Sequence, residues 1–88
     1  MPKVIINTNL IKSYQDWEKA FNAHEKERLK ANIKTIYYGH ELKDPNKVHL
    51  IFEVPSIKLL QDFMEAHSDA IEKSGHKIDS TVFVPCTD

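Results

Sequence analysis

A chain of 88 residues with 41% hydrophobic and 28% charged side chains has the composition of one globular domain, and we expect a single domain over residues 1–88. The net charge is −1 and the charges are mixed along the chain, which argues against the clustered positive field that binding to nucleic-acid phosphates requires. No apolar run is long enough to cross a membrane, and the first residues lack the features of a signal peptide. Since Cys86 is the single cysteine, the chain fits a reducing compartment, and we expect a cytoplasmic protein.

The first half of the chain predicts a strand, a helix and a second strand. Lys3–Leu10 is rich in β-branched residues and is the expected first strand. Ser13 is a good N-cap, and helical spacing continues from there to about Ala31. Asn32 then suits the end of this helix, because asparagine tolerates positive φ better than most residues. Thr35–Leu42 has the aromatic and β-branched character of a strand.

The second half repeats this order after a turn at KDPNK. Lys47–Val54 alternates between apolar and polar residues, which is typical of a half-buried strand. Pro55 and Ser56 start a helix over Ile57–Lys73, which Gly75 ends. The last predicted strand is Ser80–Val84.

The order β-α-β-β-α-β predicts an α+β, ferredoxin-like fold, with a four-stranded antiparallel sheet and two helices on one face. An offset of 43 residues aligns FNAHEKERLKANIK with MEAHSDAIEKSGHK. It matches His24 with His67 and the terminator Asn32 with Gly75. Because the identities are few, the alignment indicates equivalent roles in the two halves rather than a proven duplication.

Alternation along the strands divides the sheet into two faces. The residues expected to face the helices are Val4, Ile6, Thr8, Ile36, Tyr38, Val48, Leu50, Phe52, Val54, Val82 and Val84. The opposite face receives Ile5, Asn7, Asn9, Thr35, Tyr37, His49, Ile51, Glu53, Thr81 and Phe83. That second set is too apolar for comfortable exposure, although antiparallel sheets do leave one face in water. We therefore expect a homodimer packed sheet on sheet, with simple solvent exposure as the alternative.

The segment DPNKVHLIFEVPSIKLLQDFMEAH and the helix pattern W-x3-F-x2-H-x3-R resemble small members of the dimeric α+β barrel superfamily, in particular antibiotic-biosynthesis-monooxygenase-like proteins. The resemblance covers nearly the whole chain, but none of its motifs is diagnostic of a reaction. It implies a barrel formed by two sheets, and a pocket in each subunit between its own helices and sheet.

The inward face of the first helix contains two unexpected polar residues. At 100° per residue this face is formed by Tyr14, Trp17, Phe21, His24, Arg28 and Ala31. His24 and Arg28 lie one turn apart and can act together. Arg28 either extends to solvent from the helix end, its stem covering apolar surface, or is a cationic anchor for a carboxylate or phenolate in a pocket.

The second helix carries His67 near the centre of its inward stripe, which is Leu60, Phe63, Met64, His67, Ala70 and Ile71. A single histidine on an apolar face is usually a hydrogen-bonded core residue, but His24 and His67 occupy matching positions on neighbouring helices. We expect both to line a cavity, where either could act as a general base. Tyr38 could add a hydroxyl at the same level. The walls would be Trp17, Phe21, Phe52, Phe63 and Met64, which could equally be ordinary core.

Several sharper motifs are absent from the sequence. His24-Glu25-Lys26-Glu27-Arg28 has an arginine where a zincin has its second histidine, so we expect no metal there. The chain contains no C-x-x-C, no glycine-rich phosphate loop and no RNA-recognition motif. Cys86 lies near the terminus without an identifiable base, which disfavours a catalytic thiol.

Haem-degrading relatives within the resemblance use an asparagine on the first strand and a tryptophan and histidine on the second helix. Asn7 and His67 could take two of these roles, but no tryptophan occurs on the second helix. Strand alternation also points Asn7 away from the helices. We therefore expect no haem and no other cofactor.

Three functions remain open. The leading hypothesis is a homodimer that binds a lipophilic, anionic small molecule, fatty-acid-like or an aromatic carboxylate or phenolate, between its helices and sheet. Its ligand-binding residues would be His24, Arg28, His67, Tyr38, Trp17, Phe21, Phe63 and Met64. The second is a cofactor-independent monooxygenase or isomerase with His24 or His67 as base. The third is a dimerisation or scaffold module without a ligand.

Overall fold

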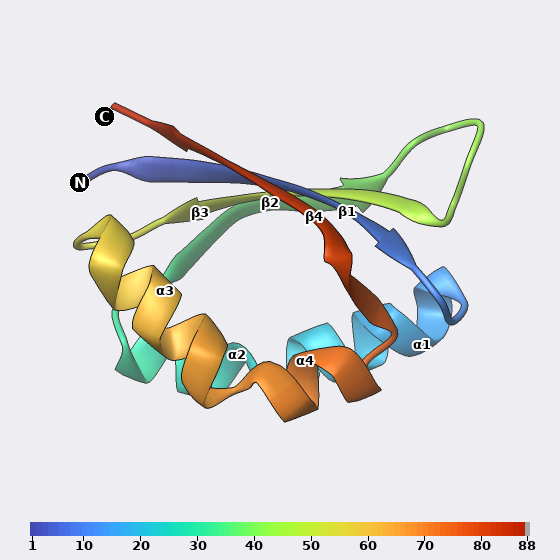
Figure 1. Cartoon of the computed structure of the whole chain (residues 1–88), viewed down its shortest axis with the longest axis horizontal. Helices are drawn as coiled ribbons and strands as arrows, with labels where there is room; N and C mark the ends of the chain where they lie inside the picture. The colour runs from blue at the N-terminus through green and yellow to red at the C-terminus, as the bar shows by residue number, and fades with distance from the viewer. Residues whose placement is uncertain (88) are drawn as a thin grey trace.

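Four antiparallel strands form one sheet, and four helices cover one of its faces (Figure 1). The computed structural model describes residues 1–87, except for the side chain of Ile78. The elements are β1 (Lys3–Leu10), α1 (Tyr14–Ala23), α2 (Glu25–Lys30), β2 (Lys34–His40), β3 (Lys47–Glu53), α3 (Ile57–Ala66), α4 (Ser68–Lys73) and β4 (His76–Cys86). With the strand order β2-β3-β1-β4, the predicted ferredoxin-like fold is confirmed.

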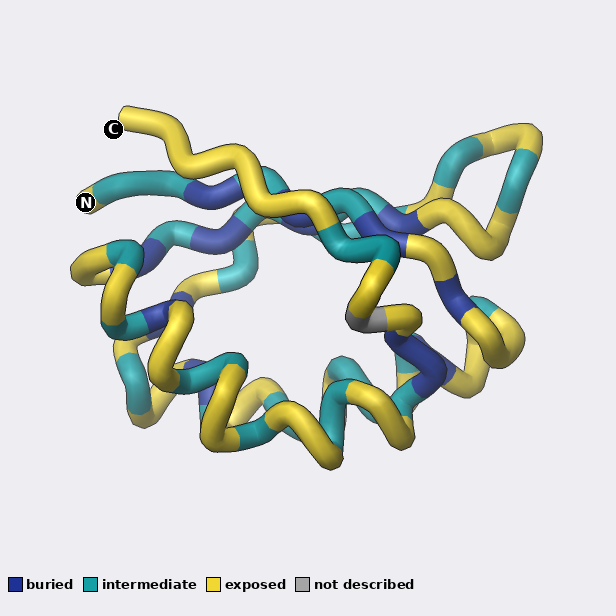
Figure 2. Tube along the Cα trace, viewed as in Figure 1, coloured by how far each residue is buried: buried dark blue, intermediate teal, exposed yellow. Residues whose placement is uncertain are grey.

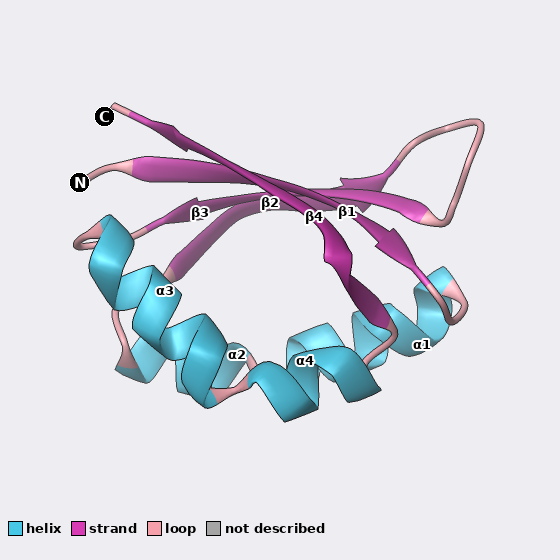
Figure 3. Cartoon of the chain, viewed as in Figure 1, coloured by secondary structure: helices cyan, strands magenta, loops and turns pink. Residues whose placement is uncertain are grey.

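Both predicted helices are interrupted at a histidine, as the helical segments in Figure 3 show. His24 separates α1 from α2 with φ −92° and ψ 4°, and His67 separates α3 from α4 with φ −110° and ψ 18°. These angles lie outside the helical range, so each pair of helices, α1–α2 and α3–α4, bends where its two helices meet. The helices α3 and α4 begin and end 43 residues after α1 and α2, which matches the offset found in the sequence.

Two left-handed residues end the helical halves, as predicted. Asn32 has φ 61° and Gly75 has φ 99°. At Gly75 an added Cβ would lie 2.7 Å from the Cβ of Lys12, so the close approach of the loop after β1 also requires glycine. Each residue turns the chain from the helical layer back into the sheet.

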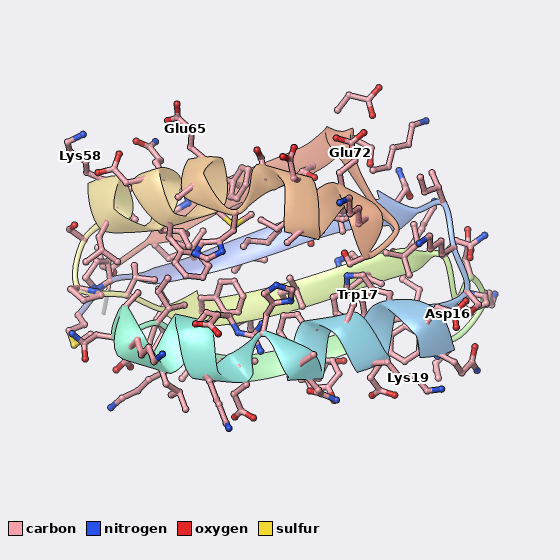
Figure 4. All side chains as sticks on the ribbon, turned by 90° about the horizontal axis from the view of Figure 1, so that it is seen from below. Asp16, Trp17, Lys19, Lys58, Glu65 and Glu72 are labelled. Atoms are coloured by element: carbon pink, nitrogen blue, oxygen red, sulfur yellow. The ribbon has the colours of Figure 1, made fainter. Side chains whose placement is uncertain are left out.

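The core lies between the sheet and the helices, along the inner faces of β1 and β3 (Figure 2). Its buried members are Val4, Ile6, Leu10, Trp17, Ile33, Val48, Leu50, Phe52, Val54 and Leu60. Trp17 is the largest, and its indole points from α1 into the interior, whereas Lys58 and Glu65 of α3 point outwards (Figure 4). No helix within residues 1–87 is long and apolar enough to cross a membrane.

The predicted orientation of the last strand was wrong. Val84 pairs with Ile5, and Val82 pairs with Asn7, so both valines share the outer face with these residues. Phe83 pairs with Ile6, and therefore faces the helices. The ladder between β1 and β4 is irregular after this point, and Thr81 also lies on the helix side, where it contacts Thr8. The pairing of β4 with β1 thus decides which face each side chain occupies, whatever its hydrophobicity.

A bulge in β2 corrects the predicted directions of Thr35 and Ile36. Thr35 pairs with Phe52, and Tyr37 with Ile51, so Ile36 is the extra residue of a bulge and is 52% exposed. Thr35 therefore shares the face of Phe52, and only Tyr38 retains its predicted direction toward the helices.

Candidate functional site

A cavity of about 60 Å³ lies between the helices and the inner face of the sheet. Seven of the eight predicted ligand-binding residues line it: Trp17, Phe21, His24, Arg28, Phe63, Met64 and His67. Phe52, predicted as a wall residue, and Leu50 form its floor on β3. The structure thus brings together side chains that are as much as 50 positions apart in the sequence.

Tyr38 is the predicted residue that does not line this cavity. Its hydroxyl donates to Oε2 of Glu18 at 3.0 Å. Its ring packs against Phe21 and Trp17, with centroids 5.0 and 5.9 Å away. Tyr38 therefore supports the aromatic wall from behind.

Arg28 is buried, with 6% of its surface exposed, so the alternative in which it extends to solvent was wrong. Its side chain folds back along the helical layer and donates from Nη1 to the carbonyl of Phe21 at 2.8 Å. That carbonyl also accepts from the backbone N–H of His24 at 3.2 Å, at the end of α1. The guanidinium also lies over the Phe21 ring, with Cζ 3.8 Å from the centroid, a cation–π contact.

The charge of Arg28 is not neutralised. Among the described residues no carboxylate forms an ion pair with it, and its buried Nε has no hydrogen-bond partner. Burial lowers the pKa of the Arg28 guanidinium, and Glu25 on the preceding turn offsets part of this effect. Arginine nevertheless remains protonated in proteins. The cavity wall therefore carries a desolvated positive charge, which costs several kcal/mol when unpaired.

His24 presents a defined nitrogen to the cavity. Its Nδ1 lies 3.1 Å from the carbonyl oxygen of Ala20. Because a carbonyl only accepts, Nδ1 carries the proton, and in the neutral ring Nε2 is then an acceptor. His24 and Arg28, one turn further along the chain, line the same cavity.

His67 completes a pair across the helical layer. Its ring centroid lies 6.4 Å from that of His24, with the planes nearly perpendicular at 78°. It also packs against Phe63 at 4.3 Å. No hydrogen bond of the His67 ring occurs within residues 1–87, so its nitrogens remain available to a molecule in the cavity.

His76 is a cavity residue that sequence reasoning missed. It begins β4, lines the cavity and is 5% exposed. Its Nε2 lies within hydrogen-bonding distance of Thr81 Oγ1, at 2.8 Å. Burial lowers the pKa of His76 to about 4, so the ring is neutral at pH 7. A signal was present in the sequence: the 43-residue offset aligns His76 with Ile33, an interior position.

The site offers cation, base and hydrogen-bonding functions on apolar walls. It has no metal-binding set, because no cluster of three His, Cys, Asp or Glu occurs in the described part of the chain. Asn7 lies on the outer face, where its Oδ1 contacts the ring of His49, so it contributes nothing to this cavity.

The sequence of residues 1–87 matches the model of a family described as a domain of unknown function, DUF3764. No functionally curated protein matches the sequence. Among solved structures, a putative antibiotic biosynthesis monooxygenase from Bordetella bronchiseptica superposes with a TM-score of 0.78 at 8% identity, covering 99% of this chain and 95% of the other. A second such protein, from Nitrosomonas europaea, gives 0.70 at 13% identity, with 100% and 98% coverage.

A third similar structure is the 5-chloro-2-hydroxyhydroquinone dehydrochlorinase of Burkholderia phenoliruptrix, in complex with 2,5-dihydroxybenzoquinone. It superposes with a TM-score of 0.55 at 22% identity, covering 96% of this chain and 91% of that one. At these identities the similarities establish the fold. The predicted resemblance to antibiotic-biosynthesis-monooxygenase-like proteins is thereby confirmed at the level of architecture.

The lowered pKa of His76 predicts acid sensitivity of the fold. Between pH 6.5 and about pH 4 the His76 side chain is protonated in the unfolded chain but neutral in the folded one. The free energy of unfolding therefore decreases as the pH falls from 6.5 to about 4, and this loss is absent above pH 6.5. The loss amounts to about 3 kcal/mol at most. Urea unfolding at pH 7 and pH 4 should show a smaller decrease for His76→Gln than for the natural chain. Equal decreases would contradict the burial of a neutral ring.

Proposed function

The chain belongs to the DUF3764 family of domains of unknown function, and we propose that it binds a small organic anion in the cavity between its helices and sheet. The observation that carries this proposal is the buried Arg28 guanidinium, which lines the cavity without an ion-pair partner among residues 1–87. A carboxylate or phenolate would supply the missing negative charge, and Arg binds such groups through its planar fork of donors.

The walls and the volume define the rest of the ligand. Phe21, Phe52 and Phe63 present aromatic surface, which favours a planar apolar body. A cavity of 60 Å³ is smaller than the roughly 150 Å³ that holds benzene in an engineered protein interior. A single aromatic ring is therefore larger than the cavity as it stands, and its entry requires the flexible Met64 and the half-buried His67 to move aside. This favours an aromatic carboxylate or phenolate over a fatty-acid-like chain.

A direct test uses benzoate and its neutral analogue benzamide as probes. We expect calorimetric titration to detect benzoate but not benzamide, and Arg28→Met to weaken benzoate binding by about 10- to 100-fold, the value of a charged hydrogen bond. Lys30→Met is the matched control, because it removes a cation from the exposed side of the same helix. Its affinity for benzoate should equal that of the natural chain.

The stability of the same variant separates binding from a structural role. Removing an unpaired buried charge should leave the unfolding free energy of Arg28→Met within about 1 kcal/mol of the natural value. A loss above about 3 kcal/mol, with benzoate affinity unchanged, would show that Arg28 serves the fold and would contradict the proposal.

A second function, cofactor-independent oxygenation or isomerisation, is favoured by the fixed ring of His24. With Nδ1 donating to Ala20, Nε2 can accept a proton from a phenolic hydroxyl, leaving an imidazolium and a phenolate. The phenolate would form beside Arg28, which stabilises its charge. The folds of the superposed oxygenases and of the dehydrochlorinase are compatible with such chemistry.

The enzymatic function predicts oxygen uptake with 1,4-dihydroxybenzene as the substrate probe. His24→Gln and His67→Gln should retain benzoate binding, and the variant lacking the base should lose about 10²- to 10⁴-fold in rate. His40→Gln is the control, since His40 is exposed and packs on Tyr14 outside the cavity. Uptake no faster than in buffer would exclude oxygenation of this substrate class and leave binding as the function.

We also propose that two chains associate through the outer face of the sheet. Ile36, Tyr37, Val82 and Val84 are 40 to 55% exposed on β2 and β4, and Ile5 pairs with Ile51 between them. An exposed apolar strip of this kind usually marks an interface. The alternative scaffold function would use this face alone and leave the cavity without a ligand.

Sedimentation at micromolar concentration tests the dimer. The natural chain should sediment as a dimer, and Ile51→Glu should be monomeric, because the substitution places like charges near the centre of the interface. Ile11→Glu changes an apolar residue that is exposed in the loop after β1, and should remain dimeric. A monomeric natural chain would contradict the sheet-on-sheet interface.

A further inference from the structure

Two polar residues occupy positions where the internal repeat has isoleucine. Arg28 on α2 corresponds to Ile71 on α4, and His76 at the start of β4 corresponds to Ile33 before β2. All but Ile33 line the cavity, and Ile33 is fully buried. Each half of the chain therefore contributes one polar side chain where apolar packing would suffice.

Arg28 and His76 come from different ends of the helical layer. Figures 1 and 4, two perpendicular views, show α2 beside α3 at one end of the layer and α4 beside α1 at the other. Arg28 belongs to the first end and His76, which follows α4, to the second. Since both line the same cavity, a molecule held there has a polar contact available from each end.

The ring of His76 is hydrogen-bonded through one nitrogen, Nε2, and its other nitrogen, Nδ1, has no bond within residues 1–87. Its Nε2 bonds to Thr81 Oγ1 at 2.8 Å, and Thr81 bonds to Thr8 Oγ1 at 3.0 Å. Both threonine hydroxyls also lie 3.3 Å from the carbonyl oxygen of Lys77, where the β1–β4 ladder is irregular. Nδ1 forms no hydrogen bond among the described residues, and it is not one of their fully buried unpaired atoms, so it retains surface that a ligand can reach.

We propose that the ligand is bound at two points, with its anionic group at Arg28 and a hydroxyl group at Nδ1 of His76. This inference rests on the proposed function and narrows its ligand to hydroxylated organic acids. A hydroxyl fits because it both donates and accepts, so it satisfies Nδ1 in either tautomer of the neutral ring. A second carboxylate fits poorly, since no further cation lies on the cavity wall among the described residues.

The experiment compares benzoate with 3-hydroxybenzoate and 4-hydroxybenzoate by calorimetric titration. At least one hydroxybenzoate should bind about three- to tenfold more tightly than benzoate, the value of one neutral hydrogen bond. His76→Phe should abolish this preference, measured as the ratio of the hydroxybenzoate and benzoate affinities of the same variant. His40→Phe, the same change outside the cavity, should retain the preference.

A second variant keeps the test decisive if His76→Phe does not fold. Thr81→Val retains the histidine but removes its hydrogen-bond partner, and should reduce the preference for the hydroxybenzoate. Equal affinities of the natural chain for all three acids, or a preference that survives the His76 and Thr81 substitutions, would contradict two-point binding while leaving the proposed function intact. Failure of all three acids to bind would overturn both.

Discussion

The site depends on one constraint, the burial of the Arg28 guanidinium without a neutralising carboxylate from residues 1–87. A charge taken out of water requires compensation, and this one receives only part of it, from one carbonyl and from the face of Phe21. The interruption at His24 makes this arrangement feasible, because the Phe21 carbonyl lies at the end of α1, where it accepts from both the His24 N–H and Arg28 Nη1. Helix geometry, aromatic wall and charge are therefore coupled through one residue.

The repeated architecture explains why the cavity lies where it does. Two helical halves of equal length, each bent at a histidine and ended by a left-handed residue, arch over a sheet that supplies the floor. Straight helices would pack their central residues closely against β1 and β3. With bends at His24 and His67, the layer instead encloses space at its middle, where the two rings meet. The two repeated halves enclose the cavity, and the two positions where they differ, Arg28 and His76, make it polar.

Much of this arrangement could be predicted from the sequence, because the helical faces follow a simple period. The inward stripe containing Trp17, Phe21, His24 and Arg28 was correct, and so were both helix ends. The errors lie in the strands beside irregular ladders. Val82 and Val84 face outward because pairing with β1 fixes their direction, and no local property of the strand reveals the shift near Asn9.

The bends and His76 escaped prediction for related reasons. A continuous helix and a bent one have the same apolar period, so the pattern around His24 does not reveal the interruption. His76 lies in a polar stretch, GHKIDS, that reads as a loop, yet β4 begins there and pairs with Leu10 at the end of β1. Its burial follows from pairing with a distant strand. The single indication of this in the sequence is the alignment of His76 with Ile33.

The central claim is that Arg28 is held in the cavity to receive an anion, and a crystal structure of the protein with benzoate tests it most directly. The account predicts a benzoate carboxylate within hydrogen-bonding distance of the Arg28 guanidinium, with its ring against Phe21 and Phe52. The account would be contradicted if benzoate bound only outside the cavity, and the cavity were closed with Arg28 paired to a carboxylate of its own chain.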